Sequence, residues 1–143
     1  MCVFHQVVSG DVLFHPKKFD LGLVLHYFQA HREAGDVACY YEMPAEEDQS
    51  RRGIVEVAAK SNRIEAFYEK PAPGTTASRL ASLVFCCFAG STAPRVREFL
   101  AEHPAAAQRS FGSFLAWLLS RRPLFGMKLP DRFSLIGDVG LLE

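Results

Sequence analysis

Short apolar runs separated by polar turns dominate this chain, and most of them have the length of β-strands. Runs of this kind, rich in β-branched and aromatic residues, are typical of strands. They cover residues 3–9, 37–42, 53–58, 64–69, 80–89, 124–129 and 133–136. The run 80–89 is apolar almost throughout, which predicts a central strand covered on both faces. The short polar turn between 53–58 and 64–69 predicts a hairpin.

Three other stretches have helical spacing. After Asp20, a natural N-cap, apolar residues recur on one helical face at Leu21, Val24, Leu25 and Phe28. Gly35 follows at a position where we expect a left-handed residue to end the helix. Residues 94–102, with a proline in the first turn, and residues 111–119 predict two further helices.

The order of these elements predicts an α/β fold. We expect a mixed, mostly parallel, Rossmann-like sheet with flanking helices, and a right-handed crossover in the first strand–helix–strand unit. With no internal repeat or linker, residues 1–143 are expected to form one domain.

Composition and charge exclude several classes of function. Sixteen basic residues balance sixteen acidic ones without a basic stripe, which argues against nucleic-acid binding. No apolar run reaches the ~18 residues of a membrane span, and residues 1–5 do not form a secretory signal. We therefore expect a cytoplasmic protein that binds no membrane. The cysteines show no metal-site spacing and are expected to be reduced thiols, mostly buried on strands: Cys2, Cys39, Cys86 and Cys87.

Three apolar runs end on charged residues suited to phosphate chemistry: Asp11, Lys70 and Asp138. Strand ends line the ligand crevice of an α/β sheet. Two carboxylates and an ammonium there form a plausible set for holding Mg²⁺ against phosphate oxygens. Glu69, beside Lys70, accepts hydrogen bonds when ionised and so suits sugar hydroxyls. Taken singly, the aspartates also fit ordinary turns, and the Glu69–Lys70 pair fits a surface ion pair.

In their order along the chain, four motifs resemble the second half of the catalytic domain of the sugar-phosphate nucleotidyltransferases, also called nucleoside-diphosphate-sugar pyrophosphorylases. The motifs are Gly10-Asp11, Gly53-Ile54-Val55-Glu56-Val57, Glu69-Lys70-Pro71 and Gly137-Asp138-Val139-Gly140. The resemblance spans nearly the whole chain, from Val7 to Gly140.

The resemblance implies a role for each residue of these motifs. Asp11 and Asp138 would hold Mg²⁺, and with Lys70 they would form the catalytic set. Lys70 would contact the phosphate of a sugar 1-phosphate, while Glu69 and the backbone of Gly53 would meet the sugar ring. The implied reaction is attack of a sugar-1-phosphate oxygen on the α-phosphorus of a nucleoside triphosphate, which releases pyrophosphate.

The chain also departs from the family pattern. No glycine-rich phosphate loop precedes Asp11, so we expect the N-terminal nucleotide-binding half to be missing and residues 1–143 to be the sugar-phosphate-binding half. Such a chain would be inactive alone and would use a nucleoside triphosphate only when missing sequence or a partner completes it. Arg52, Val84 and Ile136 replace residue types that are frequent in the family.

Two alternatives to a partial enzyme stay open. The first is a non-catalytic subunit that binds a sugar phosphate, or regulates and assembles with an active partner. The second is a plain α/β domain whose aspartates are turn residues.

Overall fold

The computed structural model describes residues 4–9, 12–14, 19–129 and 133–135 of the chain. Its strands are β1 (Phe4–Val8), β2 (Val12–Phe14), β3 (Asp36–Glu42), β4 (Gly53–Val57), β5 (Ile64–Glu69), β6 (Leu80–Ala89), β7 (Leu124–Lys128) and β8 (Phe133–Leu135). Its α-helices are α1 (Leu21–His31), α2 (Ala93–Glu102) and α3 (Phe111–Leu118). Short 3-10 turns lie at Gln49–Arg51, Gly90–Thr92 and Ala106–Gln108.

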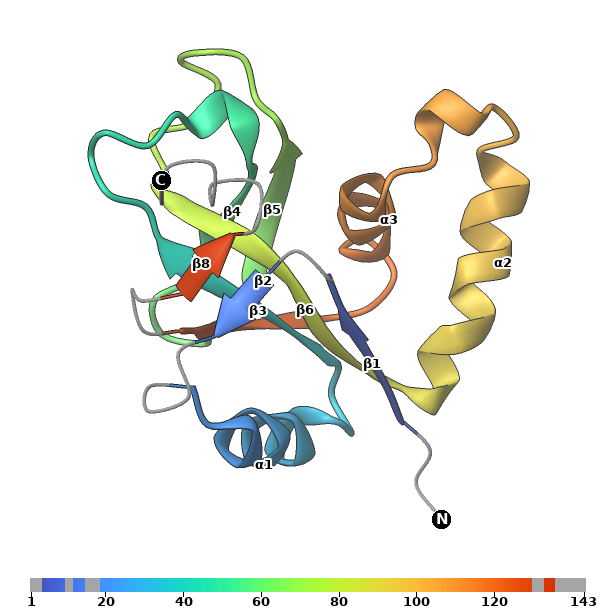
Figure 1. Ribbon diagram of the computed structural model, residues 1–143. Coiled ribbons are helices and arrows are strands. Elements are labelled where there is room, and N and C mark those ends of the chain that lie inside the picture. The colour runs from blue at the N-terminus through green and yellow to red at the C-terminus, as the bar shows by residue number, and fades with distance from the viewer. Residues whose placement is uncertain (1–3, 10–11, 15–18, 130–132, 136–143) are drawn as a thin grey trace.

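A six-stranded mixed sheet organises the described part of the chain (Figure 1). Five of its strands run in the order β5-β4-β6-β3-β7, and β1 pairs with β6. Strand β3 lies along one edge of β6, while β4 and β1 pair with opposite ends of its other edge. Strands β2 and β8 form a separate antiparallel pair. The predicted hairpin is confirmed as β4–β5, and β6 is the predicted central strand.

The expected mostly parallel sheet is wrong in one respect, although the mixed α/β class is confirmed. Only β3 and β7 pair in parallel, and every other pairing in the described sheet is antiparallel. An unbroken apolar run indicates that a strand is covered on both faces. It does not indicate whether the neighbouring strands run parallel or antiparallel to it, because that depends on pairing between distant segments.

Helices cover both faces of the sheet. Val24 and Phe28 of α1 pack against one face, where β6 contributes Leu83, Phe85 and Cys87. On the other face, Phe99 of α2 and Phe114 of α3 pack against Cys86 and Phe88 of β6, among others. The central strand therefore supplies apolar side chains to both cores, which explains its unbroken apolar sequence.

Local signals at the ends of α1 were partly correct. Asp20 is the predicted N-cap, and its carboxylate accepts a hydrogen bond from the Leu23 backbone N–H at 3.2 Å. Gly35 does not adopt the expected left-handed conformation. It is required for another reason, because a Cβ at this position would collide with the backbone carbonyl of Pro123.

A buried carboxylate ties three parts of the fold together. Asp36, at the start of β3, is fully buried. It accepts hydrogen bonds from the backbone N–H of Ala89 at 2.7 Å and from the Thr92 hydroxyl at 2.8 Å. The Arg122 guanidinium donates to the same carboxylate at 3.0 Å. Burial raises the pKa of Asp36, and these hydrogen bonds act in the opposite direction. The network joins β3 to the end of β6 and to the segment before β7.

The expectation of buried, reduced cysteines is confirmed for Cys39, Cys86 and Cys87, which are free thiols on buried strands, while Cys2 lies outside the described residues. Burial raises the pKa of the Cys87 thiol to about 11 and also raises those of Cys39 and Cys86. These thiols are therefore protonated near neutral pH and poorly reactive. No helix in the described segments is long and apolar enough to cross a bilayer.

Candidate functional site

The β4–β5 hairpin brings three of the predicted site residues together. Its register places Gly53, the first residue of β4, opposite Glu69, the last residue of β5. The next residue, Lys70, donates its backbone N–H to the Arg52 carbonyl at 3.0 Å, which extends the pairing by one step. We call Gly53, Glu69 and Lys70 the hairpin rim.

Gly53 allows an aromatic ring to approach the backbone of the rim. A Cβ at Gly53 would lie 2.7 Å from Cζ of Phe67, closer than real Cβ atoms come to such a neighbour. Phe67 packs against the core under α2 and α3. The ring of Phe67 therefore covers the backbone of Gly53 on the face where a side chain would otherwise stand.

Glu69 lies against the first turn of α3. One of its carboxylate oxygens occupies the place that a Cβ at Gly112 would take, so only glycine permits this approach. Ser110 caps α3 by accepting the Ser113 backbone N–H at 2.9 Å. A carboxylate beside a helix N-terminus is favoured by the helix dipole. The carboxylate of Glu69 therefore lies between β5 and α3, while the residue stays exposed to solvent.

Lys70 has an uncommon backbone conformation. Its φ is 46°, in the left-handed region that non-glycine residues rarely adopt. Strained backbone of this kind concentrates at functional sites. Lys70 is exposed, and its ammonium has no hydrogen-bond or ion-pair partner among the described residues. The lysine is thus available to an anion in solution.

The segment before β4 supports the hairpin rim through an ion pair and two hydrogen bonds. Arg52 forms an ion pair with Glu47 at 2.7 Å, and both side chains are mostly buried. The Tyr41 hydroxyl donates to the same carboxylate at 2.7 Å, and burial together with this bond raises the pKa of Tyr41. Arg79 donates to the Glu47 carbonyl at 2.8 Å. Arg52, noted as a departure from the family pattern, therefore supports the loop.

The structure does not test the predicted metal ligands, because Asp11 and Asp138 lie outside the described residues. No group of three or more potential metal-ligating side chains occurs within the described ranges. The Mg²⁺ site stays a prediction.

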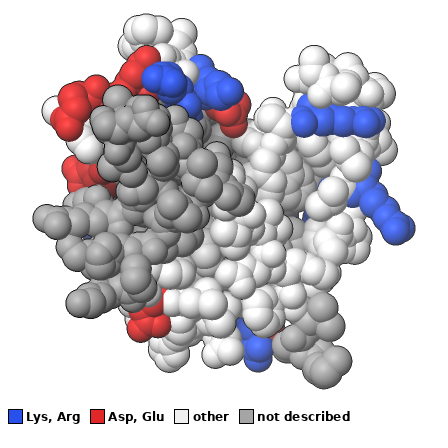
Figure 2. Space-filling model, viewed as in Figure 1, with Lys and Arg blue, Asp and Glu red and all other residues white. Residues whose placement is uncertain are grey.

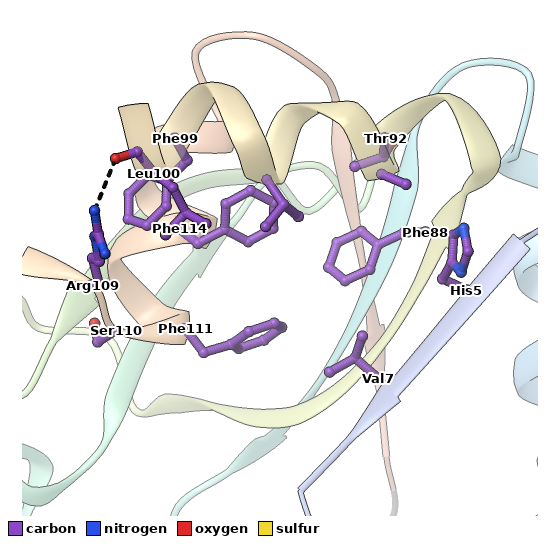
Figure 3. A pocket seen from close by; sticks show the side chains of 12 residues that line it. His5, Val7, Phe88, Thr92, Phe99, Leu100, Arg109, Ser110, Phe111 and Phe114 are labelled. Carbon is purple, nitrogen blue, oxygen red and sulfur yellow. Dashed lines mark hydrogen bonds between the residues drawn. The ribbon is translucent and has the colours of Figure 1, made fainter. Parts of the chain in front are cut away.

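The sequence did not predict an apolar groove that α3 lines together with other elements. Its volume is about 500 Å³, and it is bounded by β1, β6, α2 and α3. Figure 3 shows the rings of Phe88, Phe111 and Phe114 turned toward it, with His5 and Val7 of β1 along its opposite wall. Phe114 is also part of the core on this face of the sheet, but no local pattern in the sequence shows that α2 and α3 stand apart from β1.

No protein-family model and no curated protein matches this sequence. Similar solved structures include a protein assigned as a glucose-1-phosphate thymidylyltransferase from Bacillus anthracis, crystallised with sucrose (18% identity, TM-score 0.71). They also include an apo UDP-glucose pyrophosphorylase (18%, TM-score 0.75) and a UTP-bound UGPase from Acinetobacter baumannii (19%, TM-score 0.69).

The three alignments cover 94%, 96% and 96% of this chain but 49%, 50% and 47% of those chains, respectively. The chain thus spans about half the length of the solved structures that it matches. Over that half, it has the fold of nucleoside-diphosphate-sugar pyrophosphorylases, as the order of its motifs predicted.

Proposed function

We propose that the chain is the sugar-phosphate-binding half of a sugar-nucleotide synthase and that the hairpin rim binds a sugar 1-phosphate. The observation that carries the proposal is the register of β4 and β5. It gathers the backbone of a glycine, a carboxylate and an ammonium at one rim. The shared fold with sugar-nucleotide enzymes supports this choice of ligand.

Each rim residue has a distinct task in this proposal. Lys70 supplies a point charge for the phosphate dianion, and its strained backbone holds the side chain at the end of β5. Glu69 accepts hydrogen bonds from sugar hydroxyls and stays in place against α3. The backbone of Gly53 meets the sugar ring from the side away from Phe67.

Asp11 and Asp138 would hold Mg²⁺ in the same proposal. Two carboxylates are hard oxygen donors, which fit this ion. Bound Mg²⁺ neutralises the negative charge of the phosphates during nucleotidyl transfer. The contribution of the chain's own residues is to position the sugar phosphate and to balance its charge.

Nucleotidyl transfer also needs a site for the triphosphate. These 143 residues contain no glycine-rich phosphate loop, and the similar solved structures are about twice as long. We therefore expect the chain by itself to bind sugar 1-phosphate without releasing pyrophosphate, and nucleotide transfer to require additional polypeptide.

Titration calorimetry tests this function. Glucose 1-phosphate added to the chain with Mg²⁺ should give saturable binding, whereas inorganic phosphate should bind more weakly because it lacks the sugar. A nucleoside triphosphate added afterwards should release no pyrophosphate. Absence of glucose 1-phosphate binding by a folded chain would overturn the proposed site, and pyrophosphate release would overturn the claim that the chain is incomplete for catalysis.

Gly112→Ala should weaken glucose 1-phosphate binding without changing any charge. The new Cβ requires the Glu69 carboxylate to move from its place against α3, and it would also lie 2.9 Å from Cε1 of Phe67. Loss of one well-placed hydrogen bond weakens binding by about 1 kcal/mol, or about fivefold. Gly22→Ala, at the same position in the first turn of α1, is the matched control. Equal calorimetric affinities for both variants would show that Glu69 does not need this placement.

A further inference from the structure

The backbone conformation of Lys70 needs support from its surroundings. Its φ of 46° lies in the left-handed region, and it precedes Pro71, although a residue before proline normally adopts an extended conformation. Strain of this kind persists only where the surrounding structure holds the residue in place. The Lys70 backbone N–H donates to the Arg52 carbonyl at 3.0 Å, so the position of Arg52 bears directly on the conformation of Lys70.

Both the backbone and the side chain of Arg52 are anchored. Its backbone N–H donates to the Gln49 carbonyl at 3.3 Å and closes the 3-10 turn that Asp48 caps. Its Nε donates to Oε1 of Glu47 at 2.7 Å, and the side chains of Arg52 and Glu47 are 25% and 22% exposed. Solvent screens such a partly buried ion pair less than a pair on the open surface. Arg52 is therefore held at both ends.

Glu47 connects Arg52 to the core of the sheet. The same carboxylate oxygen accepts a hydrogen bond from the Tyr41 hydroxyl at 2.7 Å. Tyr41 is 4% exposed and belongs to the core on the face that carries α1. These contacts form one continuous path from the core, through the Glu47 carboxylate and Arg52, to the backbone of Lys70.

The backbone of this loop does not depend on the Glu47 carboxylate. The Arg79 guanidinium donates to the carbonyls of Pro44 and Glu47 at 2.5 Å and 2.8 Å. The Met43 backbone N–H donates to the Arg79 carbonyl at 2.8 Å. Figure 2 shows acidic and basic side chains gathered over this part of the molecule, at the upper left. A change in the Glu47 side chain should therefore interrupt the path to Lys70 without unfolding the loop.

We propose that Glu47 is a positioning residue of the hairpin rim, which acts through Arg52 to hold Lys70 in the conformation that presents its ammonium to the phosphate. This role rests on the proposed function, because it is defined by the phosphate that Lys70 binds. Without the Glu47 carboxylate, Arg52 loses its anchor and Lys70 can relax to an ordinary negative φ, which directs its side chain elsewhere. Because Glu47 acts through Lys70, its loss weakens binding by less than the loss of Lys70 itself.

Titration calorimetry of the full chain with glucose 1-phosphate and Mg²⁺ tests the role of Glu47. Glu47→Ala should weaken binding about fivefold, the equivalent of one hydrogen bond. Glu47→Gln keeps an acceptor oxygen for both donors and should restore most of the affinity. Glu42→Ala is the matched control, since it breaks the 2.7 Å ion pair with Lys128 and should bind like the wild type.

A double-mutant cycle separates positioning from a general structural effect. When Lys70 is already alanine, Glu47→Ala should weaken binding no further, because the group that Glu47 positions is gone. Losses that add in the double variant would overturn the proposal. Wild-type affinity of Glu47→Ala would also overturn it.

Hydrogen exchange of the Lys70 amide, measured by nuclear magnetic resonance without ligand, distinguishes failure of this inference from failure of the proposed function. The amide should exchange about fivefold faster or more in Glu47→Ala, because its bond to the Arg52 carbonyl is weakened, and at the wild-type rate in Glu42→Ala. If the amide responds in this way but no variant binds glucose 1-phosphate, the proposed ligand is wrong and the path from Glu47 to Lys70 is supported. An unchanged exchange rate in Glu47→Ala would overturn the path, whatever the chain binds.

Discussion

Replacing Asp36 with alanine should lower the free energy of unfolding by about 3–5 kcal/mol, the effect expected when one partner of a buried charged network is removed. Asp36 is fully buried, and it accepts hydrogen bonds from Ala89, Thr92 and Arg122. The variant leaves the Thr92 hydroxyl buried without this acceptor and leaves the guanidinium of Arg122, which is 21% exposed, without its carboxylate. Each of these losses destabilises the folded state.

Chemical denaturation of the wild type and variants measures this effect. Asp20→Ala is the matched control, since Asp20 is an exposed aspartate that accepts one backbone hydrogen bond as the cap of α1. Loss of such a cap costs about 1 kcal/mol. If Asp36→Ala destabilises the chain no more than Asp20→Ala, the carboxylate does not hold the ends of β3 and β6 together as described.

Lys70→Ala should weaken glucose 1-phosphate binding by about tenfold to a hundredfold. A hydrogen bond to a charged group contributes about 1.5–3 kcal/mol, and the expected loss in affinity follows from this value. The side chain of Lys70 has no other partner among the described residues, so its removal should leave the fold intact.

Two further variants separate charge from backbone strain at this position. Lys70→Gly also removes the ammonium, but glycine adopts the positive φ of 46° readily and should raise stability slightly. Lys60→Ala, in the exposed turn at the other end of the same hairpin, is the charge-matched control and should bind like the wild type. Equal affinities for the Lys60 and Lys70 variants would remove Lys70 from the site.

Features determined by neighbours in the sequence were predicted well. The cap at Asp20, the β4–β5 hairpin and the bounds of β6 all follow from residues within a few positions of one another. The register of the hairpin then brings Gly53 and Glu69 together, so this part of the site could also be predicted from the sequence.

Features determined by distant segments could not be predicted in the same way. The antiparallel direction of β6 relative to β3 depends on pairing between residues that lie far apart in the chain. The fixed position of Glu69 depends on Gly112 of α3, and the role of Gly35 depends on Pro123. A glycine in the first turn of a helix is no signal for such a contact, because Gly22 has the same position in α1 with only Asp20 beside it.

The hairpin rim as a sugar-phosphate site is tested most directly by nuclear magnetic resonance of the ¹⁵N-labelled chain. Adding glucose 1-phosphate with Mg²⁺ should shift the amide signals of Gly53, Glu69 and Lys70, and those of Lys60 and Glu65 much less. If the largest shifts fall on residues of the apolar groove, or if no signal moves, the ligand does not bind at the rim.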